Sequence, residues 1–168
     1  MNLPLLSTVF LTFALTLYVL LDGFDLGVGV LLLLQPTEKS RDHMVDSITP
    51  TWDGNETWII MAGVTLLAAF PLAYSILLPA LYIPVIIMLL SLGFRGVSFE
   101  FRVQTSRHRH KWDIAFAFGS FIAAFMQGLI LGGLIQGVQV QDLRFAGSVL
   151  DVFRPLPVIC GLALVAGY

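Results

Sequence analysis

The sequence predicts an all-α protein that crosses a membrane several times. Of its 168 residues, 57% are hydrophobic and only 12% are charged, and the mean hydropathy is +0.88. The apolar residues gather in runs of roughly 20, which is the length that an α-helix needs to cross a bilayer. We therefore expect a polytopic integral membrane helix bundle with four complete transmembrane helices and a truncated fifth.

The charged residues and the cysteine count exclude several classes of protein. The net charge is −2, which makes nucleic acid an improbable partner. The single cysteine, Cys160, excludes an internal disulfide and a multi-cysteine metal site. All three histidines lie in polar stretches, so no expected span offers a buried imidazole to a haem or a metal. These histidines are His43, His108 and His110.

The apolar runs give the expected spans in chain order. These are residues 3–34, 55–70, 75–94, 112–138 and 155–168. The first is long enough to tilt or to extend past the bilayer, and the third contains Pro79 and Pro84 as expected kinks. The last has only 14 residues and is too short to span. We expect residues 1–168 to form a single membrane domain that is the N-terminal part of a longer subunit.

The distribution of basic residues predicts the orientation. Cytoplasmic loops carry an excess of Lys and Arg, and the stretches after the first and third spans hold most of them here. They are Lys39, Arg41, Arg102, Arg107, Arg109 and Lys111. The N-terminus and the turn near Pro71 hold none, so the N-terminus is expected outside. It has no basic region typical of a signal peptide, so the first helix should remain in the mature protein.

An acidic pair interrupts the first apolar segment. Asp22 and Asp25 are three residues apart, which places both on one face of a helix. An ionisable group at the bilayer centre costs roughly 2.5–3.5 kcal/mol and usually faces the bundle interior or a water-filled cavity. We interpret the pair as part of a proton path, and a purely structural pair is the alternative. The neighbouring glycines predict close helix packing: Gly23, Gly27 and Gly29.

A second acidic segment opens the second span. Asp53 and Glu56 have the spacing of a capping box, in which Asp53 would be the N-cap and Glu56 the third helical residue. Trp52 and Trp58 suit a membrane interface. The functional alternative is a cytoplasmic mouth at which Asp53 takes up a proton from solvent.

Charged residues also close the third span and open the fourth. Arg95 ends a deep apolar run, where either snorkelling to the interface or an ion pair with an acid on another helix explains it. Glu100 lies between Phe99 and Phe101, which argues against a fully solvated carboxylate. Asp113 is predicted to be the N-cap of the fourth span.

Three strings in order resemble subunit II of the cytochrome bd-type quinol oxidases. They match along essentially the whole chain, although that subunit continues through further helices. The residue string Asn55-Glu56-Thr57-Trp58 is more similar to the cyanide-insensitive branch of this family. The strings are Leu21-Asp22-Gly23-Phe24-Asp25-Leu26-Gly27-Val28-Gly29, Trp52-Asp53-Gly54-Asn55, and Phe94-Arg95 through Phe99-Glu100-Phe101-Arg102.

The resemblance implies a subunit of a terminal quinol:O2 oxidoreductase in the aerobic respiratory chain of a bacterial inner membrane. Its partner in a heterodimer would be subunit I, which holds the quinol site and the haems, either b and d or b alone. This chain would bind no haem or metal through its own ligands and would have no catalytic residue. The resemblance leaves open a small single-helix accessory subunit.

The resemblance also implies which residues carry protons from the cytoplasm towards O2 reduction. By position, the residues that match the family's path acids are Asp22 or Asp25, Asp53 and Glu100. At the position of Glu100 the family has Asp. Trp52 and Arg95 would line the path, with Arg95 tuning the proton affinity of the carboxylates. Two further functions remain open from the residues alone. They are a proton-coupled transporter and a purely structural assembly subunit.

Overall fold

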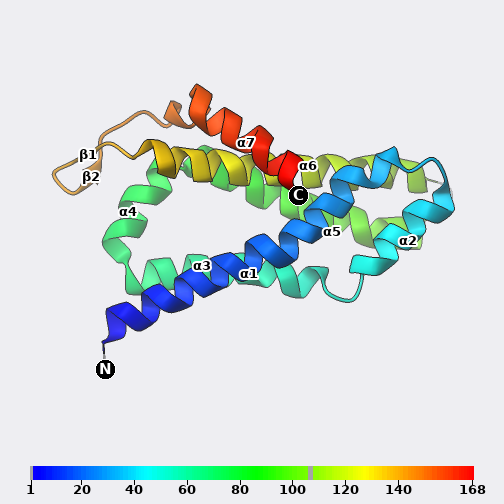
Figure 1. The fold of residues 1–168 in the computed structure, drawn as a ribbon, viewed down its shortest axis with the longest axis horizontal. Coiled ribbons are helices and arrows are strands. Elements are labelled where there is room, and N and C mark those ends of the chain that lie inside the picture. The colour runs from blue at the N-terminus through cyan, green and yellow to red at the C-terminus, as the bar shows by residue number, and fades with distance from the viewer. Residues whose placement is uncertain (1, 106–107) are drawn as a thin grey trace.

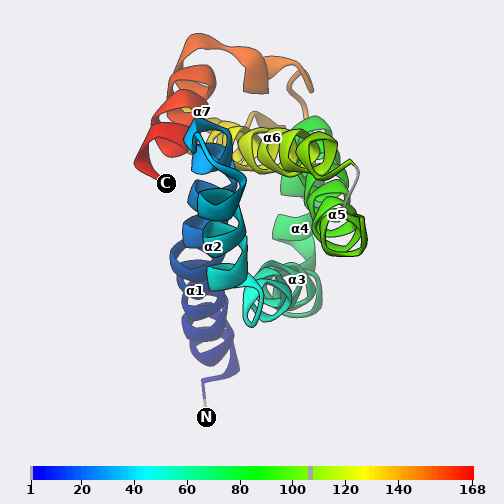
Figure 2. The ribbon, with the colours of Figure 1, turned by 90° about the vertical axis from the view of Figure 1, so that its right-hand side faces the viewer.

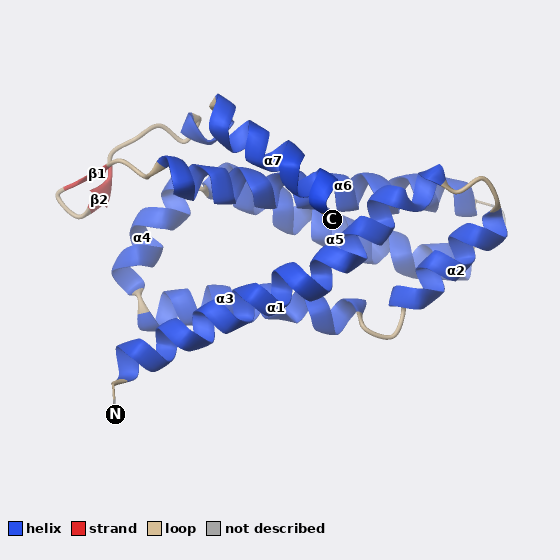
Figure 3. Ribbon diagram, viewed as in Figure 1, coloured by secondary structure: helices blue, strands red, loops and turns tan. Residues whose placement is uncertain are grey.

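The computed structural model describes residues 2–105 and 108–168 and is almost entirely helical (Figure 1, Figure 3). The helices are α1 (Leu3–Leu31), α2 (Glu38–Ile48), α3 (Trp52–Ala69), α4 (Pro71–Ala80), α5 (Tyr82–Gln104), α6 (Arg109–Gln136) and α7 (Pro155–Gly167). There are also two short 3-10 helices. The first, η1 (Leu32–Leu34), follows α1, and the second, η2 (Asp151–Phe153), precedes α7. A small antiparallel ribbon joins α6 to η2 through β1 (Val140–Gln141) and β2 (Arg144–Phe145).

Three of the described helical segments are long and apolar enough to cross a membrane: Leu3–Leu34, Tyr82–Gln104 and Arg109–Gln136. The predicted all-α membrane fold is therefore confirmed, but the predicted count of four complete spans is not. Helix α3 stands where the second span was expected. It begins at Trp52 rather than at residue 55, so it contains Asp53 in addition to Glu56, and both acids lower its hydropathy.

The third predicted span, 75–94, has the wrong boundaries. The chain forms two helices there, and the break falls at Leu81, whose φ of −109° and ψ of 15° leave the helical region. Pro84 lies in the first turn of α5, where its missing N–H would have no helical partner in any case. Helix α5 then continues ten residues past Phe94 to Gln104.

The polar stretch after the first span is also more regular than expected. It contains α2, whose N-cap is Thr37. The Thr37 hydroxyl accepts a hydrogen bond from the backbone N–H of Ser40 at 3.1 Å, as N-cap side chains commonly do. This helix brings Arg41 and Asp42 to α5 and α6. Arg107, one of the basic residues that predict the orientation, lies outside the described residues.

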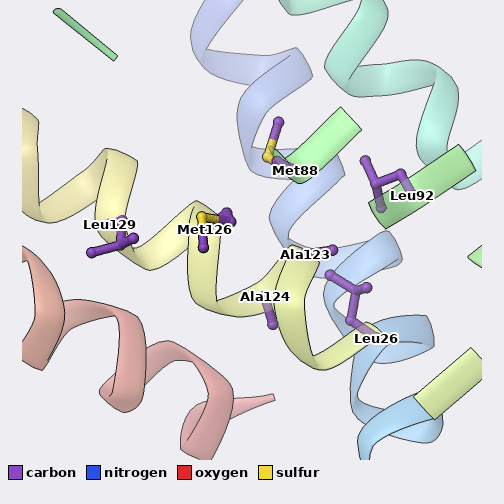
Figure 4. Close-up of a cluster of buried hydrophobic side chains, with 7 residues drawn as sticks. All are labelled: Leu26, Met88, Leu92, Ala123, Ala124, Met126 and Leu129. Atoms are coloured by element: carbon purple, nitrogen blue, oxygen red, sulfur yellow. The ribbon is translucent and has the colours of Figure 1, made fainter. Parts of the chain in front are cut away.

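Helix α6 lies at the centre of the packing. It contacts α5, α7 and α1, and α1 also packs along α3. Figure 2 shows α6 between α7 and α5, with α3 beside α1 on the side away from α7. The largest buried apolar cluster joins α1, α5 and α6 (Figure 4). Its members are Leu26, Met88, Leu92, Ala123, Ala124, Met126 and Leu129.

Helices α6 and α7 lie in close backbone contact at Gly128. A Cβ atom at Gly128 would lie 2.5 Å from the Cys160 carbonyl oxygen and 2.7 Å from the Gly161 backbone nitrogen. These are backbone atoms, so α7 would have to move away. By contrast, a Cβ at Gly63 on α3 would meet nothing within 4 Å.

We expect Gly128→Ala to lower the free energy of unfolding by about 1–3 kcal/mol, the usual cost of overpacking. Gly63→Ala is the matched control, and it should be neutral or stabilising because Ala favours a helix over Gly. The measurement is thermal unfolding of the full-length chain in detergent. Equal stability of the two variants would show that α6 and α7 do not touch at this point.

Candidate functional site

Three helices bring charged side chains together in the interior. Arg95 on α5 contacts Asp22 on α1 and Glu56 on α3. The Arg95 Nη2 atom donates to Asp22 Oδ1 at 2.6 Å and to Glu56 Oε1 at 2.5 Å. The Nε atom of Arg95 also donates to Glu56 Oε1, at 3.1 Å. We call these three residues the Arg95 cluster. Arg95 therefore forms an ion pair across helices rather than snorkelling to the interface.

The burial of the Arg95 cluster makes its charge balance important. The side chains of Arg95 and Asp22 are 1% and 0% exposed, whereas that of Glu56 is 19% exposed. If both carboxylates are ionised, one guanidinium faces two negative charges. An uncompensated charge in a low-dielectric interior is costly. The cluster therefore carries one more negative than positive charge unless a proton is bound to one of its two carboxylates.

Asp25 lies next to this cluster but has a different partner. Its side chain is buried, and Oδ2 accepts a hydrogen bond from Asn55 Nδ2 at 2.8 Å. Asn55 and Glu56 are neighbours at the start of α3, so one residue binds Asp25 directly and the next shares Arg95 with Asp22. This arrangement requires α1 and α3 to lie side by side, as they do along much of their length.

The glycines around the acidic pair lie at close contacts. Cβ atoms at Gly23 and Gly27 would overlap Tyr168 on α7, and a Cβ at Gly29 would overlap Ser120 on α6. This face of α1 can therefore approach α6 and α7 only because it carries no side chains at these positions.

The other predicted path acids lie apart from the Arg95 cluster. Asp53 and Glu100 are both exposed, and neither forms an ion pair within residues 2–105 and 108–168. Glu100 follows Arg95 by five residues on α5, a rotation of about 140° around the helix, so it faces another direction. Trp52 packs on Phe99 with a ring-centroid distance of 5.2 Å.

The capping-box prediction at the start of α3 was wrong. Thr51 occupies the N-cap position, and no side chain caps the helix there. Asp53 instead lies inside the first turn, and Glu56 turns to Arg95. The ion pair with a buried guanidinium is worth more to Glu56 than a hydrogen bond to an exposed backbone N–H would be.

A second charged cluster joins α2, α5 and α6. Asp113 is fully buried and accepts hydrogen bonds from Arg102 Nε at 2.5 Å and Arg41 Nε at 2.9 Å. Arg102 Nη2 also donates to Asp42 Oδ1 at 2.7 Å, and Arg109 Nη1 lies 3.2 Å from Asp42 Oδ2. We call this set the Asp113 cluster. The prediction that Asp113 caps α6 was wrong, because α6 begins one turn earlier, at Arg109.

A signal for both clusters is present in the sequence of α5. Four polar residues follow one another on this helix at spacings of four, three and four, which places them on a single helix face. All four are buried: Ser91, Arg95, Ser98 and Arg102. A polar stripe with this period indicates that the helix presents its charged face to other helices rather than to lipid.

Comparison with known proteins identifies the family of this chain. Residues 3–168 match the family described as cytochrome bd terminal oxidase subunit II. The chain belongs to that family. This confirms the family resemblance predicted from the three sequence strings.

Several curated members of the cytochrome bd subunit II family are similar to this chain. Cytochrome bd-I ubiquinol oxidase subunit 2 of Escherichia coli (strain K12) is 36% identical over 152 residues, which cover 86% of this chain and 40% of the relative. Cytochrome bd ubiquinol oxidase subunit 2 of Bacillus subtilis (strain 168) is 34% identical, with coverages of 86% and 44%. The chain thus spans about two fifths of the length of these relatives.

The residues that the structure describes offer no evident site for a haem or a metal ion. They contain no group of three or more His, Cys, Asp or Glu side chains that could hold a metal. The histidines are exposed, at His43, His108 and His110.

Proposed function

We propose that the chain is part of the non-haem subunit of a quinol:O2 oxidoreductase, in which it supports the haem subunit and supplies protons for O2 reduction. The observation that carries the proposal is the Arg95 cluster, where two carboxylates share one buried guanidinium. Such a group can bind and release a proton while its net charge varies only between zero and minus one.

The start of α3 provides the outer part of this proton path. Asp53 is exposed, Glu56 follows three residues later with partial exposure, and Asp22 is fully buried. The three acids thus form a gradient from the surface to the interior. Asp25, bound to Asn55, provides a second buried carboxylate near the same point.

Glu100 and Trp52 have separate places in the proposal. Glu100 is exposed on α5, so it would take part through a surface shared with another segment or subunit. Trp52 is the first residue of α3 and packs against Phe99 and Gly96 of α5, where it would line the path.

The partner in this proposal is subunit I of the oxidase. It would hold two b-type haems and a d-type haem, or b-type haems alone, and would oxidise the quinol. The many large apolar side chains exposed on α1, α5 and α6 are suited to lipid and to such a subunit. We place the two basic loops in the cytoplasm of a bacterial inner membrane and the N-terminus outside.

Purification tests the complex. The full-length protein, isolated mildly from its native membrane, should show haem bands in a reduced-minus-oxidised spectrum that follow a second subunit. It should also take up O2 when quinol is added. A colourless protein without a partner would contradict the proposal and favour a transporter.

Glu56→Gln should lower quinol-driven O2 turnover of the assembled complex by roughly 10- to 100-fold, because it removes a proton-transfer group and keeps the side-chain shape. The measurement is turnover per haem, so differences in yield do not count. Asp46→Asn, at an exposed site on α2, is the control and should keep normal turnover.

A purely structural role makes the opposite prediction for Asp22→Asn, Asp53→Asn and Glu56→Gln. These variants would lower the yield of the complex and leave turnover per haem unchanged. That result would remove the proton path from the proposal and retain the subunit assignment.

A further inference from the structure

A hydrogen-bond chain joins α1, α6 and Tyr168, the residue after α7, beside the Arg95 cluster. The Tyr168 hydroxyl donates to Gln127 Oε1 at 2.7 Å, and Gln127 Nε2 donates to the Tyr18 hydroxyl oxygen at 2.5 Å. Tyr18 on α1 is 3% exposed, and Gln127 on α6 is 9% exposed. A polar chain at this depth is costly unless its groups are paired, so its arrangement is informative.

The chain has a direction that ends at Asp22. Because the Tyr18 oxygen accepts from Gln127, its own O–H is left to donate elsewhere. Asp22 lies four residues further along α1, on the same helix face. Its Oδ2 atom is buried and has no hydrogen-bond partner among the described residues. Since buried polar atoms are almost always paired, the Tyr18 hydroxyl and this oxygen are each other's natural partners.

We propose that the Tyr168–Gln127–Tyr18 chain directs the Tyr18 hydroxyl to Asp22 and keeps Asp22 as the ionised partner of Arg95, so that Glu56 is the carboxyl group that takes up and releases the mobile proton. This rests on the proton path proposed above and specifies which acid of that path carries the proton. Tyr18 contacts the carboxylate, whereas Gln127 is a positioning residue that acts through Tyr18.

The surroundings of the two carboxylates support this division. Three charged groups lie around Asp22. Arg95 contacts it from α5, Glu56 shares this arginine from α3, and Asp25 lies about one turn further along α1. Hydrogen bonds to a carboxylate favour its charged form, and Asp22 would receive them from both Arg95 and Tyr18. Glu56 receives hydrogen bonds only from Arg95 within the described part of the chain. Its partial exposure of 19% also gives it access to the outside.

Infrared difference spectroscopy of the full-length protein in its assembled complex tests the assignment. The signal is the C=O stretch of a protonated carboxylic acid, which an ionised carboxylate does not give. Neutralising either acid would leave one carboxylate for one arginine and remove the shared proton, so the test variants keep both carboxyl groups. At neutral pH, Glu56→Asp should shift the frequency of the band of the Arg95 cluster, and Asp22→Glu should leave it unchanged. A shift in Asp22→Glu with an unchanged band in Glu56→Asp would overturn the proposal, as would a spectrum that neither variant changes.

Variants of the chain itself test the positioning role. Gln127→Leu and Tyr18→Phe should transfer the proton to Asp22, so in these backgrounds the band should shift with Asp22→Glu and stay unchanged with Glu56→Asp. The turnover–pH profile should also move to higher pH, because a carboxylate that has lost a donor retains its proton longer. Gln136→Leu on α6 and Tyr82→Phe on α5 are controls for the two changes and should alter neither readout.

The two proposals fail in different ways. Normal turnover in Glu56→Gln would contradict proton delivery, whichever residue gives the band. A band that stays with Glu56 in both Gln127→Leu and Tyr18→Phe would contradict the positioning role, whatever the turnover. Tyr18→Phe removes a single oxygen atom, so it serves if Gln127→Leu does not assemble.

Discussion

Arg95→Met should destabilise the full-length protein by about 3–5 kcal/mol, which is the usual cost of removing one partner of a buried ion pair. Met retains much of the length of the side chain, so the loss is mainly electrostatic. The variant leaves the carboxylates of Asp22 and Glu56 together without a cation in a site where Asp22 is 0% exposed. We expect little assembled complex in the membrane and a large fall in the unfolding temperature of what remains.

A double-mutant cycle distinguishes this cause from a loss of packing. The variant Arg95→Met/Asp22→Asn removes the cation together with one anion, so it should recover part of the lost stability. Asp22→Asn alone should cost less than Arg95→Met, since Glu56 continues to neutralise the arginine. Strict additivity of the two changes would contradict a direct interaction between Arg95 and Asp22.

The sequence predicted the fold class well because membrane helices leave a strong signal in composition. An apolar run as long as Leu3–Leu34 is typical of a helix that crosses a bilayer. The boundaries of the helices were harder to predict from the sequence. The third span was placed too early because Arg95 and Arg102 were interpreted as the end of a helix and a loop, whereas buried carboxylates on α1, α3 and α6 hold both residues inside α5.

The sequence predicted the site residues that lie in the middle of an apolar run. It did not predict the acids whose positions could also be explained as helix caps. Asp22 and Asp25 stood out because no cap or turn accounts for an acid at that depth. Glu56 and Asp113 were assigned to helix caps, because their spacing fitted that role. Only the tertiary structure shows that each is bound to an arginine far away in the sequence or on another helix.

The two charged clusters on α5 differ in charge balance, and this suggests different roles. The Arg95 cluster has two acids for one arginine, so it favours binding a proton. In the Asp113 cluster, two arginines contact the one buried acid. Such a site is suited to joining helices and not to exchanging protons.

Asp113→Leu should therefore destabilise the protein by about 3–5 kcal/mol, because it leaves the guanidinium of Arg102, which is 3% exposed, without its buried partner. The effect should be visible as a lower unfolding temperature and as faster proteolysis at the junction of α2, α5 and α6. Arg109→Ala is the internal control. Its ion pairs at 3.2 and 3.4 Å are more exposed, so it should cost no more than about 1 kcal/mol.

The functional readout of Asp113→Leu is as informative as its stability. If the Asp113 cluster is structural, the complex that does assemble should turn over normally per haem, in contrast to Glu56→Gln. Asp46→Leu, at an exposed site on α2, should change neither quantity. A fall in turnover per haem with unchanged stability would instead place Asp113 on the proton path. The division of labour between the two clusters of α5 would then be wrong.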